Sequence, residues 1–353
     1  MDTQRLAITP LTSLRFFAAI YVLVFHSGSH LFENGKWPEL ITNLLRNGYL
    51  GVSFFFVLSG FILTYSYAGR LKCATDVKVY GLARFARIYP LYALALILWL
   101  PISSEPYENG PLALATVFMV QSWGVVPSPA GFFWNMPAWT LSVEVFFYLL
   151  FPLALAATEM LKGRSLWAGF GFIAVIVLVL GIPALGPVSD HILRFEWMRL
   201  IPLPVLKFAE FLLGVFAARL FLFRAFTILR FDIAGVLIAV ATIGVLMASR
   251  EVWAASLSAI CFTGIIVATA ANEGRIRRLL SFKPLVLLGS ASYAIYLLQT
   301  VVRAWIRVLV TGDAEWLGRA IYQPVLITIA ILAFLYIEEP ARRYLKPLAI
   351  RPA

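Results

Sequence analysis

The stretch SLRFFAAIYVLVFHSG, residues 13–28, decides the class of fold because it is apolar almost throughout and yet carries Arg15 and His26. With its flanks it is long enough to cross a bilayer, which takes about 20 apolar residues. An ionisable side chain inside such a span is costly and usually functional. On a helix the two residues are about 16 Å and about 20° apart, so they face the same way. The stretch therefore predicts a transmembrane helix whose two ionisable residues serve the function of the protein.

The rest of the chain has the same character. It has 353 residues, of which 61% are hydrophobic and 13% are charged, whereas about a quarter of the residues of soluble domains are charged. We therefore expect an all-α, polytopic membrane protein in which residues 1–353 form a single integral membrane domain. The net charge of +11 is explained by basic cytoplasmic loops, so nucleic acid is not expected as a partner.

Apolar runs of spanning length predict about ten transmembrane helices. The runs lie near residues 11–32, 48–67, 85–101, 139–158, 167–183, 204–222, 231–248, 252–271, 287–308 and 320–337. An even number of spans puts both termini on one side, and the loops of that side hold most of the Lys and Arg residues, whereas the loop 102–138 holds none. Both termini are therefore expected in the cytoplasm. The run 112–123 is too short to cross and is interpreted as interfacial or re-entrant.

Two arginines stand at the cytoplasmic start of the third predicted span, in RFARIYPLY, residues 84–92. Arg84 and Arg87 are one helical turn apart on a shared face. Two guanidinium groups placed in this way can hold a phosphate. The alternative is ordinary anchoring by positive residues on the inner side of the membrane.

His26 and Glu144 are the candidates for catalysis. Glu144 lies in PAWTLSVEVFFYLLFP, residues 137–152, and counting along the helices puts it at a depth similar to that of His26. A carboxylate beside an imidazole fixes its tautomer and raises its basicity, which is the pairing that activates a hydroxyl in acyl transfer. Taken alone, His26 would be a satisfied core group, and Arg15 could extend to the headgroups.

The remaining reactive side chains predict no further chemistry. His26 and His30 are one turn apart, but they have no third ligand nearby, so no metal site is expected. Cys73 and Cys261 fall in a predicted cytoplasmic loop and in an apolar run, which argues against a disulfide. Ser59 and Gly60 are interpreted as small residues that allow close helix packing.

Six motifs together resemble, in order and context, the acyltransferase 3 family of bacterial membrane O-acyltransferases. They are LTSLRFFAAIYVLVFH, GVSFFFVLSGF, RFARIYPLY, WTLSVEVFFYLLFP, GSASYAIYLLQ and YIEEPARRYL. By this resemblance His26 is the family's essential histidine, Arg15 its arginine partner, Arg84 and Arg87 the pair associated with acyl-CoA, and Glu144 the acidic position. Gln299 departs from the pattern, because many members have histidine there.

The resemblance implies a membrane O-acyltransferase of the bacterial inner membrane. The expected donor is cytoplasmic acyl-CoA, most simply acetyl-CoA, and no permanently bound cofactor is expected. The expected acceptor is a hydroxyl of a carbohydrate or glycolipid, in exopolysaccharide, lipopolysaccharide or a related glycan. Two alternatives are acylation of a lipid or a secreted small molecule and, in a different class, a proton-coupled transporter that uses His26 and Glu144 as a relay.

Overall fold

The protein is described by a computed structural model that covers residues 8–32, 37–102, 110–124, 134–180, 201–223, 231–250 and 252–350. Every regular element within these ranges is helical, as predicted. The principal helices are α1 (Thr9–Phe32), α2 (Glu39–Arg46), α3 (Gly51–Tyr67), α4 (Ala74–Trp99), α5 (Gly110–Val117), α6 (Trp139–Glu159), α7 (Arg164–Val179), α8 (Leu203–Leu222), α9 (Phe231–Ala248), α10 (Val252–Ala271), α11 (Arg275–Leu280), α12 (Lys283–Ser290), α13 (Ser292–Leu309), α14 (Glu315–Ala333) and α15 (Glu339–Ile350).

The described residues contain six helices long and apolar enough to cross a membrane, or seven if the bent pair α12 and α13 forms one span. The protein is therefore a polytopic membrane protein. A helix lies within each of the ten predicted ranges, but α7 and α9 are shorter apolar helices, and α8 carries three charged residues. Of the helix α5, which has eight residues and is too short to cross a membrane, all but the first two lie in the predicted run 112–123.

The chain divides into two compact units. The first comprises Met1–Arg70, Leu150–Ile201 and Val205–Gly289, and the second comprises Leu71–Leu149, Pro202–Pro204 and Ser290–Ala353. The candidate residues Arg15 and His26 belong to the first unit, whereas Arg84, Arg87 and Glu144 belong to the second.

In the first unit, glycines allow α3 and α8 to cross in backbone contact. A Cβ atom on Gly60 would lie 2.1 Å from the backbone oxygen of Phe211, and one on Gly214 would lie 1.9 Å from that of Val57. Since no side chain fits at either position, only glycine permits this approach. The close packing predicted for Gly60 is confirmed.

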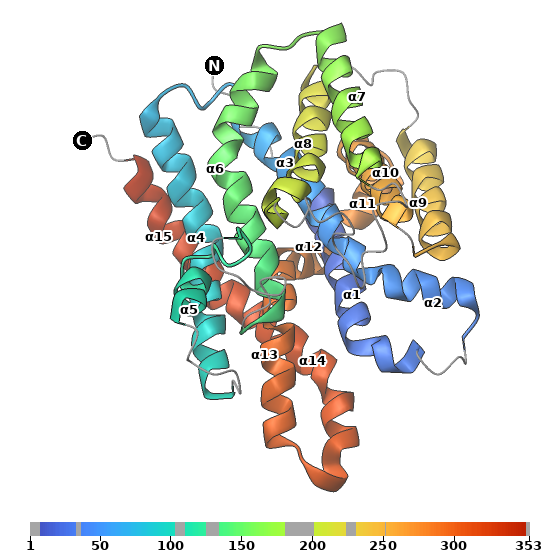
Figure 1. The fold of residues 1–353 in the computed structure, drawn as a ribbon, viewed down its shortest axis with the longest axis vertical. Helices are drawn as coiled ribbons and strands as arrows, with labels where there is room; N and C mark the ends of the chain where they lie inside the picture. Colours follow the sequence, from blue (N-terminus) through green and yellow to red (C-terminus); the bar gives the residue numbers. More distant parts are fainter. Residues whose placement is uncertain are drawn as a thin grey trace. The chain divides into compact units, whose positions relative to one another are not determined.

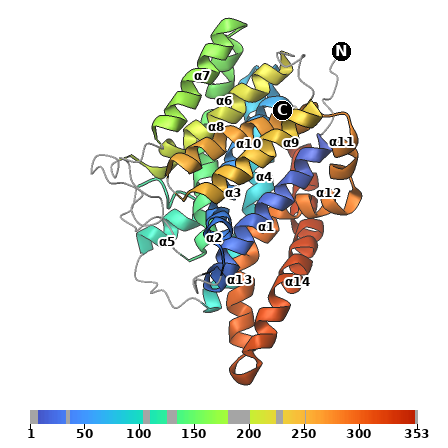
Figure 2. The ribbon, with the colours of Figure 1, turned by 90° about the vertical axis from the view of Figure 1, so that its right-hand side faces the viewer.

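Two further contacts fix α1 within the same unit. At its N-terminal end, the Ser13 hydroxyl donates a hydrogen bond of 2.5 Å to the backbone oxygen of Leu280. Further along, Gly48 and Gly51 press against α1, because a Cβ atom on Gly51 would lie 2.8 Å from the backbone oxygen of Ala18. The helix that carries Arg15 and His26 is thus held at both halves by close packing. Figure 2 shows α1 beside α3 and, next to them, the antiparallel neighbours α9 and α10.

In the second unit, α4 packs along α15 and α13 packs along α14 (Figure 1). The helix α14 is joined to α15 by a π-helical turn, Phe334–Glu338. Such turns insert an extra residue into a helix and occur frequently at functional sites. Glu338, the last residue of this turn, contacts α4 through Arg87.

Candidate active site

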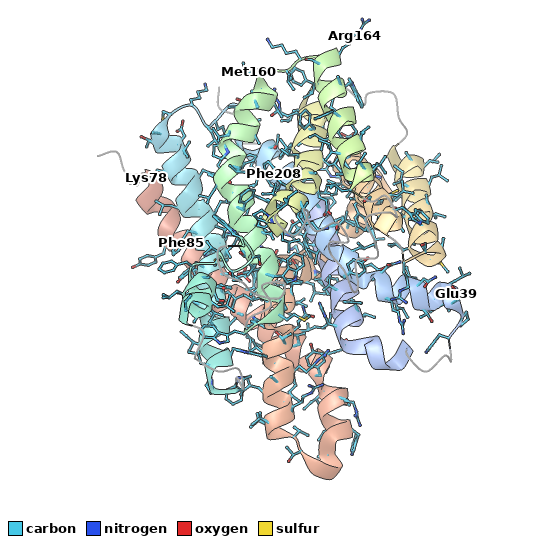
Figure 3. The ribbon with its side chains drawn as sticks, viewed as in Figure 1. Glu39, Lys78, Phe85, Met160, Arg164 and Phe208 are labelled. Atoms are coloured by element: carbon cyan, nitrogen blue, oxygen red, sulfur yellow. The ribbon has the colours of Figure 1, made fainter. Side chains whose placement is uncertain are left out.

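The helix α4 presents the two predicted arginines. Its start is fixed by Asp76, whose carboxylate accepts hydrogen bonds from the backbone nitrogens of Lys72 and Cys73 at 2.8 and 3.0 Å, an arrangement that satisfies amide groups at a helix start. The helix begins at Ala74, about three turns before Arg84, so the predicted start near residue 85 was too late. Lys78 and Phe85 lie on this helix in Figure 3. Arg84 and Arg87 are one turn apart, as predicted.

Arg87 is engaged in a buried ion pair. Its Nη1 atom lies 2.7 Å from Oε2 of Glu338, and the two side chains are 13% and 1% exposed. A carboxylate buried to this extent is costly unless a cation and hydrogen bonds compensate its charge. The pair therefore joins α4 to the π-helical turn across 251 positions of sequence.

Tyr293 supports the same guanidinium. The Arg87 Cζ atom lies 5.6 Å from the centre of the Tyr293 ring, within the range of a cation–π interaction. The Tyr293 hydroxyl donates a hydrogen bond of 2.8 Å to the backbone oxygen of Ile88. Arg87 is consequently fixed by one charge and one aromatic face.

Glu338 was missed as a site residue, although the motif YIEEPARRYL contains it. A signal was available, because the residue lies at the end of the last predicted span, where a carboxylate is costly. Its partner was not predictable, since pairing between residues so far apart leaves no local pattern.

Arg84 and Glu144 are joined by tyrosines of the second unit. The Arg84 Cζ atom lies 6.0 Å from the ring centres of both Tyr80 and Tyr148. The Tyr148 hydroxyl donates a hydrogen bond of 3.3 Å to Oε2 of Glu144. Three of the five predicted site residues, Arg84, Arg87 and Glu144, therefore gather around one group of tyrosines.

The other two predicted residues lie on α1 in the first unit, and both are partly buried. The His26 ring contacts the Phe25 ring edge-on, with centroids 5.0 Å apart, and Phe25 in turn contacts Tyr49 at 5.8 Å.

A charged pair on α8 belongs to the same unit and was also missed. Lys207 Nζ lies 2.6 Å from Oε1 of Glu210. Among the described residues, the second carboxylate oxygen of Glu210 has no hydrogen-bond partner. Phe208, between the two on α8, is labelled in Figure 3. Two opposite charges three residues apart in an apolar run were the available signal.

The remaining candidates of the sequence lie apart from this chemistry. Gln299 is buried in α13, where its Nε2 donates a hydrogen bond of 2.8 Å to the backbone oxygen of Tyr296. Cys73 and Cys261 are free thiols. Within the described part of the chain, no group of three or more His, Cys, Asp or Glu residues could hold a metal. The His30 side chain lies outside the described side chains.

Comparison of the sequence with models of known protein families identifies the family of the chain. The family model described as "Acyltransferase domain" matches residues 10–338. The chain belongs to the acyltransferase 3 family. It is a membrane acyltransferase, and the resemblance expected from its motifs is confirmed. No solved structure matches it.

Curated relatives fall into two kinds. The acyltransferase MdmB of Streptomyces mycarofaciens is 27% identical over 100% of this chain and 97% of its own length. The O-acetyltransferase OatA of Staphylococcus aureus is 24% identical over 94% of this chain, and the peptidoglycan O-acetyltransferase OatA of Listeria monocytogenes is 27% identical over 96%. The chain spans nearly all of MdmB, but only 57% and 56% of the two OatA proteins.

Because only Glu338 takes part in the buried ion pair, its substitution should destabilise the protein more than substitution of the neighbouring Glu339. Changing Glu338→Gln leaves the buried charge of Arg87 without its partner, and breaking a buried pair costs about 3–5 kcal/mol. Thermal unfolding of the purified protein in detergent, followed by size-exclusion chromatography, should show a clear drop in the melting midpoint. The matched control is Glu339→Gln, which removes a carboxylate that is 31% exposed and should change the midpoint little. Equal midpoints for the two variants would contradict a stabilising role of the pair.

Proposed function

We propose that the protein transfers an acyl group, most simply acetyl, from cytoplasmic acyl-CoA to a hydroxyl of a sugar in exopolysaccharide, lipopolysaccharide or a related glycan. The observation that carries the proposal is the gathering of Arg84, Arg87 and Glu144 within one unit of a chain that matches the acyltransferase family over residues 10–338. The names of the two OatA relatives support O-acetylation. Acylation of a secreted small molecule or a lipid is the second candidate.

The donor binds to the arginines of α4. Guanidinium groups bind phosphate through pairs of N–H donors, and the charge of the phosphates is offset at this helix. The bond from Arg87 to Glu338 uses one of the five N–H donors of that guanidinium. Arg15 on α1 supplies a further cation for the donor. The transporter alternative has no comparable use for these arginines and none for the family match.

His26 carries out the proton transfer. Its imidazole takes the proton of the acceptor hydroxyl while the oxygen attacks the thioester carbonyl carbon. The carbon–sulfur bond breaks, and the proton passes to the departing thiolate, so that an ester and free coenzyme A are formed. A transient acyl-histidine is the alternative route, and acyl-enzyme trapped from labelled acyl-CoA without acceptor would support it. General-base assistance contributes about 100-fold to about 10,000-fold to such reactions.

His26→Ala is therefore expected to abolish transfer of label from radioactive acetyl-CoA to the polysaccharide fraction of membranes from cells that produce the protein. Its matched control is His30→Ala, which removes a histidine one turn further along the chain and should leave transfer largely intact. Immunoblots of the membrane fraction should show equal amounts of both variants. Residual transfer by the His26 variant at more than about a tenth of the wild-type rate would contradict the base role.

Glu144 is proposed to orient His26. If so, Glu144→Gln lowers kcat between about tenfold and about 100-fold, a part of the full contribution of the base, and leaves the KM for acetyl-CoA unchanged. The matched control is Glu159→Gln on the same helix, whose carboxylate accepts a hydrogen bond from the backbone nitrogen of Gly69. A change confined to the KM for acetyl-CoA would instead assign Glu144 to the arginine side, where Tyr148 holds it.

We further propose that the chain crosses the bacterial inner membrane ten times and that both termini lie in the cytoplasm. The two cysteines test this orientation without engineered reporters, because Cys73 is exposed and Cys261 is partly buried in α10. A membrane-impermeant maleimide should label Cys73 in inside-out vesicles and not in intact spheroplasts. The variant Cys73→Ser controls for labelling of Cys261. Labelling of Cys73 from the outside would reverse the assigned topology.

A further inference from the structure

The C-terminal helix α15 brings additional arginines to the donor side of the second unit. It begins at Glu339, immediately after the residue that pairs with Arg87, and it packs along α4 (Figure 1). Residues four positions apart lie on the same face of a helix. Arg342 follows Glu338 by four positions, so it lies on the side of α15 that meets α4, whereas Arg343 is turned by about 100° from it.

The two neighbouring arginines differ in exposure and in surroundings. Arg342 is 48% exposed and its Nη1 lies 3.5 Å from Oε2 of Glu339. Arg343 is 79% exposed, and its Nε lies 2.9 Å from the other oxygen of the same carboxylate. Arg342 lies on the face of α15 that packs along α4, the helix that carries Arg84 and Arg87. Arg342 therefore belongs with the arginines of α4, whereas Arg343 lies on the exposed side of α15.

At the start of α15, positive charge exceeds negative charge, because the carboxylate of Glu339 is shared between Arg342 and Arg343. The preceding carboxylate, Glu338, is paired with Arg87. Like charges held at one place repel one another, and a bound anion relieves that repulsion. Guanidinium groups suit phosphate oxygens in particular, because their planar N–H donors match two oxygens at once. The local charge thus fits a ligand with several phosphate groups.

We propose that Arg342 binds the 3′-phosphate on the ribose of the coenzyme A donor, while Arg84 and Arg87 hold its diphosphate. This inference rests on the proposed use of acyl-CoA and adds a residue and a phosphate to it. The half-exposed position of Arg342 suits the phosphate at the nucleotide end of the donor, and the more enclosed arginines of α4 suit the diphosphate, which lies closer to the thioester. Glu338 acts as a positioning residue that keeps Arg87 directed along α4.

Binding to the purified full-length chain tests the proposal without knowledge of the acceptor. Coenzyme A and 3′-dephospho-coenzyme A are compared by calorimetric titration in detergent micelles. Arg342→Gln should weaken coenzyme A binding about tenfold, as expected for one charge-assisted contact, and leave the binding of the dephospho compound unchanged. Arg343→Gln, the matched control, should bind both ligands like the wild type. Arg342→Lys should recover most of the lost affinity, because it restores the charge.

The possible failures are distinguishable. If Arg342→Gln binds coenzyme A like the wild type, or if it loses affinity for both ligands equally, Arg342 does not bind the 3′-phosphate and the inference is wrong. In either case, a loss of both ligands in Arg84→Gln would still support the proposed function. If Arg84→Gln and Arg87→Gln also bind coenzyme A normally, the donor site itself is wrong. Melting midpoints measured on each variant separate loss of binding from loss of fold.

Discussion

The buried ion pair between Arg87 and Glu338 is the constraint on which the second unit depends. A carboxylate with 1% exposure in a chain that is 61% hydrophobic has no water to stabilise it, so its position is dictated by the cation. Glu338 is the last residue of the π-helical turn, and α15 begins at the next residue, so the ion pair ties the end of this turn and the start of α15 to α4.

The ion pair also gives the two arginines of α4 different environments. Arg87 has an internal counter-charge and an aromatic face, so its orientation is set before any ligand arrives. Arg84 lies beside the rings of Tyr80 and Tyr148, which attract a cation. A cation that is already oriented lowers the ordering cost of binding an anion. The spacing of the two residues alone would not distinguish their roles.

Much of the fold could be predicted from the sequence, because long apolar runs in a membrane protein have little choice but to form helices. The shared face of Arg84 and Arg87 followed from helix geometry. The bend of 56° between α12 and α13 was not predicted, although Gly289 and Ser290 interrupt that apolar run. A glycine is required at position 289 because the backbone there contacts Thr12, which is 277 positions away. The partners of Arg87 and Glu144 were missed for different reasons. Glu338 is remote in sequence, whereas Tyr148 is four residues from Glu144, and this hydrogen bond could have been predicted.

The carboxylates inside the apolar helices differ in the cations and hydrogen-bond donors that compensate their charge. Glu338 is committed to Arg87, and Glu144 has Tyr148 as a donor. In the first unit, Glu210 uses one oxygen for Lys207 and keeps the other without a hydrogen-bond partner among the described residues. A buried oxygen in that state is costly, and catalytic sites are the places where such costs are retained. The unit that carries His26 therefore holds a carboxylate of its own.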